Sequence, residues 1–186
     1  MDAVGGAIYS AGSVEATESL FATNKAQAMF GFGAGTGGAG RGGAIYNSGF
    51  LSLSECWIAN NQAQGAPACL CGAARQNGPS FGGGLFNRGK SQLTACTFSM
   101  NVIRNSQRSS DYHPLANRHD FGLTRGAGLY NAGACTVVVC TWFSNEVEVI
   151  HSTNGFSLPL TNNPHLGGAI HQESGSLSVK QSTLAG

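Results

Sequence analysis

Segment 102–125 is rich in charged and imidazole side chains that could bind an anion or ligate a metal ion. It holds Arg104, Arg108, Asp111, His113, Arg118, His119, Asp120 and Arg125. Arginines can bind an anion, and imidazoles with carboxylates can ligate a metal ion. A metal site needs ligands that converge from a fixed backbone, which neighbours in one loop do not provide. We therefore expect a solvated loop with local ion pairs, no metal or other cofactor, and an arginine surface available for interaction.

Two glycine-rich segments match nucleotide-binding patterns letter by letter. Residues 84–91 satisfy the phosphate-loop pattern, and residues 33–38 fit a dinucleotide fingerprint. Both patterns require a following helix, because backbone amides and the helix N-terminus hold the phosphates. Here strand-like sequence follows each segment. We therefore predict that neither segment binds a nucleotide.

The six cysteines fall into two groups. Three recur at one position of a repeat: Cys56, Cys96 and Cys140. Cys69 and Cys71 lie between repeats, and Cys135 occupies a position expected to point inward. A buried reduced cysteine behaves as a small apolar residue, and the spacing matches no zinc ribbon. A disulfide stays geometrically possible, so the redox state and the cellular compartment are left open.

The elements that position these side chains belong to a repeated pattern. Five copies open with Gly5-Gly6-Ala7-Ile8-Tyr9, Gly42-Gly43-Ala44-Ile45-Tyr46, Gly82-Gly83-Gly84-Leu85-Phe86, Gly126-Ala127-Gly128-Leu129-Tyr130 and Gly167-Gly168-Ala169-Ile170-His171. Self-similarity at about forty residues is typical of stacked repeats, in which no single unit buries its own apolar face. After each opening, apolar residues alternate with the period of a strand and are interrupted by glycine and asparagine.

Three short strands per copy follow from this alternation. Stacking the copies predicts an all-β, right-handed parallel β-helix, a solenoid of about five rungs with one long insertion loop per rung. The whole chain 1–186 is then one domain, with rungs near 5–24, 42–61, 82–101, 126–145 and 167–186 and insertions at 25–41, 62–81, 102–125 and 146–166. Equivalent residues should stack about 4.8 Å apart.

The stacking predicts columns of equal residues along the solenoid. Asn47, Asn87 and Asn131 should form one hydrogen-bonded ladder, and Asn24, Asn61, Asn101 and Asn145 a second. The three repeat cysteines should form an internal column. Asparagine also tolerates the left-handed backbone that sharp corners require. We interpret all these residues as structural.

The aromatic residue that closes each opening should point away from the aliphatic residue before it. This gives a candidate interaction surface of Tyr9, Tyr46, Phe86, Tyr130 and His171, to which we add Arg104, Arg108, Arg118 and Arg125. Exposed aromatic stripes often form interfaces. In the alternative arrangement, the insertions cover these rings.

Acidic residues are few and scattered. The carboxylates are Asp2, Glu15, Glu18, Glu55, Asp111, Asp120, Glu146, Glu148 and Glu173. Many parallel β-helices are polysaccharide lyases or hydrolases, and such chemistry needs carboxylates clustered on successive rungs. Only Glu18 and Glu55 share a repeat position, and Ala95 and Val139 follow there. We therefore do not expect an enzyme.

Composition narrows the partners. Charged residues make up 10% of the chain and the net charge is +1, which gives no general attraction to polyanions. The arginines of 102–125 do not interleave with aromatic residues as a single-strand nucleic-acid surface would. No run of eighteen apolar residues occurs. We expect protein partners, without nucleic acid, membrane insertion or a small molecule.

The openings Gly-Gly-Ala-Ile, with the segments ending at Asn24, Asn61, Asn101 and Asn145, resemble the GGA(I/L/V) and FxxN repeats of chlamydial polymorphic outer membrane proteins. Similar repeats occur in pectin-lyase-like β-helix proteins. The resemblance covers the chain outside the insertions. It implies a secreted or cell-surface location and an adhesive passenger, although this chain shows no targeting segment.

The sequence thus predicts a non-catalytic structural or protein-interaction module. Its first repeat starts at once and its fifth stops before the asparagine, which leaves open strand edges and indicates a fragment or part of a larger assembly. A fragment of a secreted or cell-surface adhesin is the first alternative. A polysaccharide-active lyase or hydrolase is the second.

Overall fold

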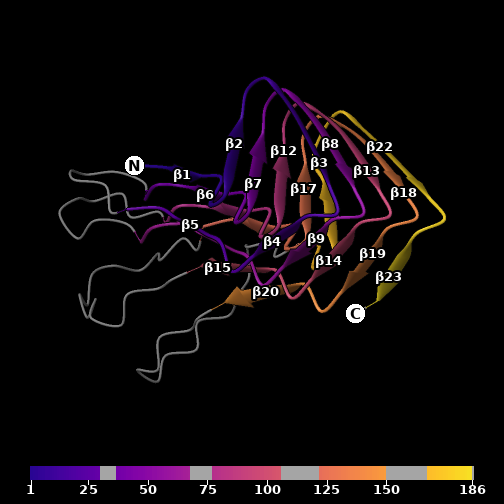
Figure 1. Cartoon of the computed structure of the whole chain (residues 1–186). Helices are drawn as coiled ribbons and strands as arrows, with labels where there is room; N and C mark the ends of the chain where they lie inside the picture. Colours follow the sequence, from indigo (N-terminus) through magenta and orange to yellow (C-terminus); the bar gives the residue numbers. More distant parts are fainter. Residues whose placement is uncertain (30–36, 68–76, 106–121, 150–166, 186) are drawn as a thin grey trace, which may run out of the picture.

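The computed structural model describes residues 1–29, 37–67, 77–105, 122–149 and 167–185. Within these ranges the chain is all-β and every strand pairing is parallel. Figure 1 shows the strands stacked as successive coils from the indigo N-terminal coil to the yellow C-terminal one. The prediction of an all-β parallel solenoid is therefore confirmed. None of the described elements is a helix long and apolar enough to cross a membrane.

Three five-stranded sheets form the main wall of the solenoid. The first sheet contains β2 (Ile8–Ser10), β7 (Ile45–Asn47), β12 (Leu85–Asn87), β17 (Leu129–Asn131) and β21 (Ile170–Gln172). The second contains β3 (Ser13–Thr17), β8 (Phe50–Ser54), β13 (Lys90–Thr94), β18 (Ala134–Val138) and β22 (Ser176–Lys180). The third contains β4 (Leu20–Ala22), β9 (Trp57–Ala59), β14 (Thr97–Ser99), β19 (Thr141–Phe143) and β23 (Thr183–Ala185). Each repeat copy supplies one strand to each sheet.

Two four-stranded sheets add a two-layer extension to this wall. One contains β1 (Ala3–Val4), β6 (Gly40–Arg41), β11 (Ser80–Phe81) and β16 (Thr124–Arg125). The other contains β5 (Lys25–Gln27), β10 (Gln62–Gln64), β15 (Val102–Asn105) and β20 (Glu146–Val149). The two layers lie so close that a Cβ on Gly40 would sit 2.4 Å from the carbonyl oxygen of Gln64.

The extension corrects the expectation of three strands per copy. Each predicted insertion begins with a strand of one layer, and the first three end with a strand of the other layer. Two residues suffice for β6 or β16, because parallel neighbours above and below supply the backbone hydrogen bonds. The coil therefore has five sides, and the ends of the insertion ranges belong to it.

The strands form because every second side chain enters a continuous apolar interior. The second sheet shows the alternation clearly, with Leu51 and Leu53 buried and Ser52 between them half-exposed. Phe98 and Trp142 stack inside at 5.2 Å between ring centroids, and both are fully buried. The closed interior is lined by three sheets, so each coil buries its apolar side chains only through its neighbours.

Both asparagine ladders are present. Asn47 Nδ2 donates to Asn87 Oδ1 at 2.8 Å, and Asn87 Nδ2 donates to Asn131 Oδ1 at 2.6 Å. In the second ladder the Nδ2-to-Oδ1 distances from Asn24 to Asn61, Asn61 to Asn101 and Asn101 to Asn145 are 3.0, 2.9 and 2.9 Å. The cysteine column is also confirmed, and its three thiols are free and buried. Cys135 is buried and free as well.

Ladder asparagines do not adopt the left-handed backbone, contrary to expectation. The residue immediately before a position of the second ladder or of the cysteine column does so instead, as at Glu55, Asn60, Ala95, Met100, Val139 and Ser144, with φ between 50° and 55°. The asparagine side chain is needed inside the corner for hydrogen bonding. The preceding residue makes the sharp bend and can be of almost any type, at a cost in backbone strain.

Candidate interaction groove beside an aromatic ladder

The aromatic residues of the repeat openings form a continuous stack along the first sheet. We call Tyr9, Tyr46, Phe86, Tyr130 and His171 the aromatic ladder. Successive ring centroids lie 5.2, 5.0, 4.9 and 5.4 Å apart, with interplanar angles between 4° and 18°. This spacing follows from the register of the strands, which pairs Tyr46 with Phe86 and Phe86 with Tyr130. The ladder lies outside the apolar interior, since the aliphatic residue before each ring points inward.

A second column of side chains faces the ladder from the extension. Arg41, Phe81 and Arg125 share one register position on β6, β11 and β16. The glycine that follows each of them has φ between 62° and 66°, which turns the chain sharply into the ladder strand. The Phe81 ring consequently lies 4.8 Å from the Tyr130 ring and 6.2 Å from the Phe86 ring, measured between centroids.

The column of Arg41, Phe81 and Arg125, which we call the covering column, changes the solvent exposure expected for the aromatic ladder. Tyr9 is 59% exposed and Tyr46 is half-buried, whereas Phe86 and Tyr130 are each only 6% exposed. An aromatic stripe open to solvent along its length is therefore not what the structure shows. Phe86 and Tyr130 are nevertheless not part of the interior cluster, because neighbouring rings and Phe81 cover them from outside.

A groove of about 420 Å³ runs beside the ladder. Its lining comes from the ladder, from the covering column and from residues two or three positions after the ladder residues. It contains Arg41, Tyr46, Phe81, Phe86, Arg88, Tyr130, Ala132 and Ser174. The groove is therefore lined by aromatic and arginine side chains, with small side chains on the later coils.

At the N-terminal end of the groove, Arg41 is held by Asp2. The Arg41 Nη1 donates to Asp2 Oδ2 at 2.5 Å, and the Ala39 amide donates to Asp2 Oδ1 at 2.8 Å. Burial disfavours the charged carboxylate, but these two hydrogen bonds outweigh it and lower the pKa of Asp2. The pair fixes the guanidinium of Arg41, which lines the groove together with Tyr46.

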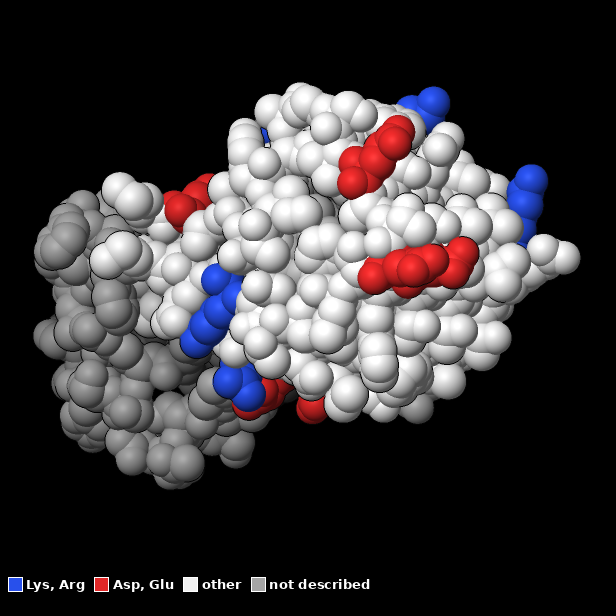
Figure 2. Space-filling model, viewed as in Figure 1, with Lys and Arg blue, Asp and Glu red and all other residues white. Residues whose placement is uncertain are grey.

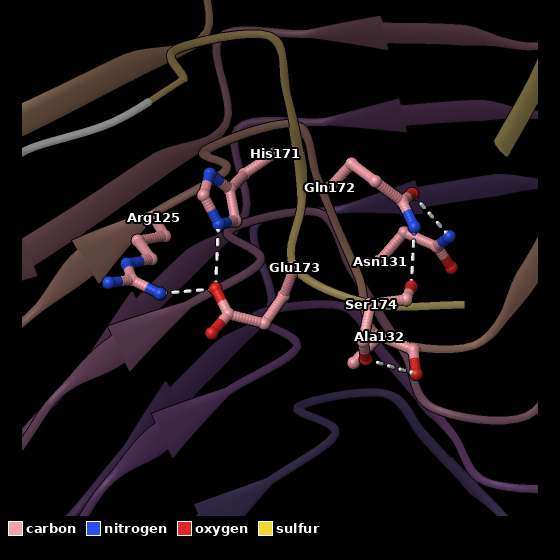
Figure 3. Close-up of polar contacts among 7 residues, drawn as sticks. All are labelled: Arg125, Asn131, Ala132, His171, Gln172, Glu173 and Ser174. Atoms are coloured by element: carbon pink, nitrogen blue, oxygen red, sulfur yellow. Dashed lines mark hydrogen bonds and ion pairs between the residues drawn. The ribbon is translucent and has the colours of Figure 1, made fainter. Parts of the chain in front are cut away.

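At the C-terminal end, Glu173 contacts both Arg125 and His171, as Figure 3 shows. Its carboxylate accepts hydrogen bonds from His171 Nε2 at 2.9 Å and from Arg125. The hydrogen bond to His171, and then that to Arg125, lower the pKa of Glu173. Burial and the Glu173 charge raise the pKa of the Tyr130 hydroxyl, which Arg125 partly opposes.

The loop that carries Glu173 is fixed to the coil below it. Asn131 Nδ2 donates to Gln172 Oε1 at 2.7 Å, and Ser174 Oγ donates to the Ala132 carbonyl at 3.1 Å (Figure 3). Gln172 therefore continues the asparagine ladder with a longer amide. These hydrogen bonds hold the segment that carries Glu173 in a fixed position at the C-terminal end of the groove.

Two arginine groups retain unused donors. Arg88 is exposed at the groove, and its guanidinium makes no ion pair or hydrogen bond with the described residues. Arg125 uses its Nη1 for Glu173, while its Nε is buried without a hydrogen-bond partner in the described part of the chain. The groove region therefore has guanidinium N–H donors that the nearby carboxylates Asp2 and Glu173 do not use.

Of the other arginines that the sequence suggested, the structure describes Arg104 away from the groove. Arg104, on β15, pairs with Glu148 on β20 at 2.5 Å, in the other layer of the extension. Arg108 and Arg118 lie outside the described residues, as do Asp111, His113, His119 and Asp120. Cys69 and Cys71 also lie outside them. Among the described residues, no group of three potential ligands is placed to hold a metal ion.

The segment that matched the phosphate-loop pattern forms strands β12 and β13. Its Lys90 points out of the second sheet, 5.9 Å from the centroid of the Phe50 ring. Figure 2 shows that most of the visible face of the coils carries neither acidic nor basic side chains. This face offers no extended basic track that would suit a polyanion.

The sequence prediction missed Arg41, Phe81 and Arg88 as groove residues. A signal for the first two was present, because a residue with a long side chain immediately precedes the opening glycine in three copies. Arg88 stands where the first, second and fourth copies have alanine or serine and the fifth has Glu173. Comparison of the chain with protein-family models, curated proteins and solved structures finds no significant match.

Proposed function

We propose that the protein is a non-catalytic interaction module whose groove beside the aromatic ladder receives a partner protein. The observation that carries this proposal is the composition of the groove, where tyrosine, phenylalanine and arginine converge. These residue types are enriched at the energetic centres of protein interfaces. The parallel strands hold them in a fixed geometry, so little conformational entropy is lost on binding.

The acid groups near the groove support a binding role over catalysis. Asp2 and Glu173 stand at opposite ends, and each is ion-paired with an arginine. Acid–base hydrolysis of a glycosidic bond uses two carboxyl groups that flank one scissile bond. The groove centre, around Phe86, is lined by aromatic and arginine side chains. The resemblance to polymorphic outer membrane protein repeats adds a secreted or cell-surface location to the proposal.

Photo-crosslinking tests the proposal. p-Benzoylphenylalanine replaces Ser174, which is exposed and lines the groove, or Gln92, which is exposed on the second sheet in the coil of Arg88. In its native cells the Ser174 variant should crosslink to one defined protein, and the Gln92 variant should not. A chain that stays monomeric and yields no crosslink from Ser174 would overturn the proposal.

A further inference from the structure

The charges around the groove are unevenly satisfied. Arg41 and Arg125 each have a carboxylate partner, at opposite ends of the groove. Arg88 lies between these ends in the coil order and has no acidic partner among the described residues. The groove therefore presents one uncompensated cation near its middle, with a fixed carboxylate toward each end.

The aromatic lining reinforces this preference for negative charge. The rings of Tyr46, Phe86 and Tyr130 stack nearly parallel, so each ring face is covered by its neighbours and the groove beside them meets ring edges. The edge of an aromatic ring carries the positive part of its quadrupole. The Tyr46 hydroxyl can also donate a hydrogen bond. A carboxylate placed over this lining meets favourable electrostatics from both the rings and Arg88.

The dimensions of the groove match an extended peptide. Its lining runs from Tyr46 in the second coil to Ser174 in the fifth. Three steps of about 4.8 Å give a length of roughly 14 Å, which an extended segment of about four residues spans. A single small anion would occupy only part of 420 Å³.

The same charge pattern argues against a polyanion. Binding to a nucleic acid requires the neutralisation of several phosphates. The groove offers one unpaired guanidinium, and the carboxylates of Asp2 and Glu173 would repel further negative charge at the ends. The preferred ligand therefore carries one acidic side chain in the middle and uncharged residues on both sides.

We propose that the groove binds an extended segment of a partner protein that presents one central carboxylate to Arg88, flanked by apolar side chains that contact Phe81 and the aromatic ladder. This inference rests on the proposed function and names the chemistry of its partner. Alternate side chains of an extended segment point to opposite sides. The acid thus faces the Arg88 side, while its neighbours face the covering column.

Two fluorescein-labelled peptides test the inference by fluorescence anisotropy. The probe is acetyl-Ser-Phe-Glu-Phe-Ser-amide, and the matched control carries Gln in place of Glu. The Glu peptide should bind about tenfold more tightly than the Gln peptide, as expected for one desolvated charge pair. The Arg88→Gln variant should lose this preference and bind the Glu peptide about tenfold more weakly.

Lys90→Gln provides the matched protein control. It removes the same charge two residues away, from a side chain that points out of the second sheet. It should leave the affinity for the Glu peptide within about twofold. Equal binding of both peptides, equal effects of Arg88→Gln and Lys90→Gln, or no binding of either peptide up to about 1 mM would overturn the inference.

The outcomes separate this inference from the proposed function. If the Ser174 variant crosslinks to a partner but the two peptides bind equally or not at all, the proposed interaction groove is retained. The proposed specificity for an acidic segment is then wrong. Absence of both the crosslink and the peptide preference would remove both proposals.

Discussion

Adjacent residues of one strand meet opposite environments on the two sides of the solenoid wall. Leu85 points into the interior and Phe86 points out, although both are buried. Inside, the equivalent residues Ile45, Leu85 and Leu129 are all fully buried, because each coil adds the same neighbours. Outside, exposure falls from 59% at Tyr9 to 6% at Phe86.

This difference shows which part of the molecule the repeat controls. The interior depends on repeat positions, and its aliphatic column is equally buried in the three middle coils. The outer face depends on the residue before each opening glycine, which varies among Val4, Arg41, Phe81 and Arg125. Stability should therefore reside mainly inside, and binding specificity should reside outside.

The largest effect is expected from emptying the interior. Phe98→Ala removes a fully buried ring that stacks on Trp142. It should lower the free energy of unfolding by about 3–5 kcal/mol, because the closed interior cannot collapse around the cavity. Urea denaturation measures this loss. Phe98→Leu, which keeps more of the volume, should cost clearly less, and equal losses for the two variants would contradict a tightly packed interior.

The asparagine ladder should come next. Asn87→Ala removes the Oδ1 that accepts from Asn47 Nδ2 and the Nδ2 that donates to Asn131 Oδ1, both in a buried corner. Unsatisfied buried groups of this kind should lower the free energy of unfolding by about 2–3 kcal/mol. Gln92→Ala, which removes an exposed amide from the same coil, should change it by less than about 0.5 kcal/mol. Similar values for the two variants would show that the ladder adds little.

Removal of a ring from the aromatic ladder should lower the free energy of unfolding by an amount that depends on how well neighbouring side chains cover that ring. Tyr130→Ala removes a ring stacked between two neighbours and covered by Phe81, whereas Tyr9→Ala removes an exposed ring with one stacked neighbour. We expect losses of about 2 and about 1 kcal/mol, respectively, in the free energy of unfolding. Thermal and urea unfolding of both variants checks the order. Equal losses would mean that the covering column contributes no stability.

The smallest effect concerns acid pH at the end of the groove. Because the folded-state pKa of Glu173 is lowered, its ionised form stabilises the fold above its ordinary pKa of 4.5, and this contribution is lost as the pH falls through the lowered value. Below pH 4.5 the melting temperature of the native chain should fall more steeply than that of Glu173→Gln. Glu18→Gln, an exposed site without an ion pair among the described residues, should behave like the native chain. Parallel slopes for all three would refute the role of Glu173.

The repeat positions were predictable because each carries a local and recurring signal. The alternation at Leu51 and Leu53, the asparagine at 87 and the aromatic at 86 each recur in register, and parallel stacking converts recurrence into contact. For strands β6, β11 and β16 of the extension, the recurring signal is limited to one long side chain before the opening glycine. Strands β6 and β11 have two residues each, too few for any periodicity, and they become strands only through their neighbours.

The groove was partly predictable for the same reason. The ladder rings follow from the repeat, but their cover follows from a backbone bend at Gly42 and Gly82 that turns Arg41 and Phe81 toward them. No sequence pattern within one repeat copy predicts the contact between these side chains and the ladder rings. Likewise, the left-handed corner residues Glu55 and Ala95 share no chemical type, so their conformation is dictated by the closed coil rather than by their identity.

In the two-layer extension, the strand pairing does not depend on the sequences that connect one layer to the other. The chain leaves the coil along β5, β10 or β15 and returns along β6, β11 or β16, and the paired strands keep one register although the connecting sequences differ in length. A change of length there alters no rung contact. The solenoid can thus serve as a display platform, on which new connecting sequences are grafted or diversified by evolution without redesign of the body that carries them.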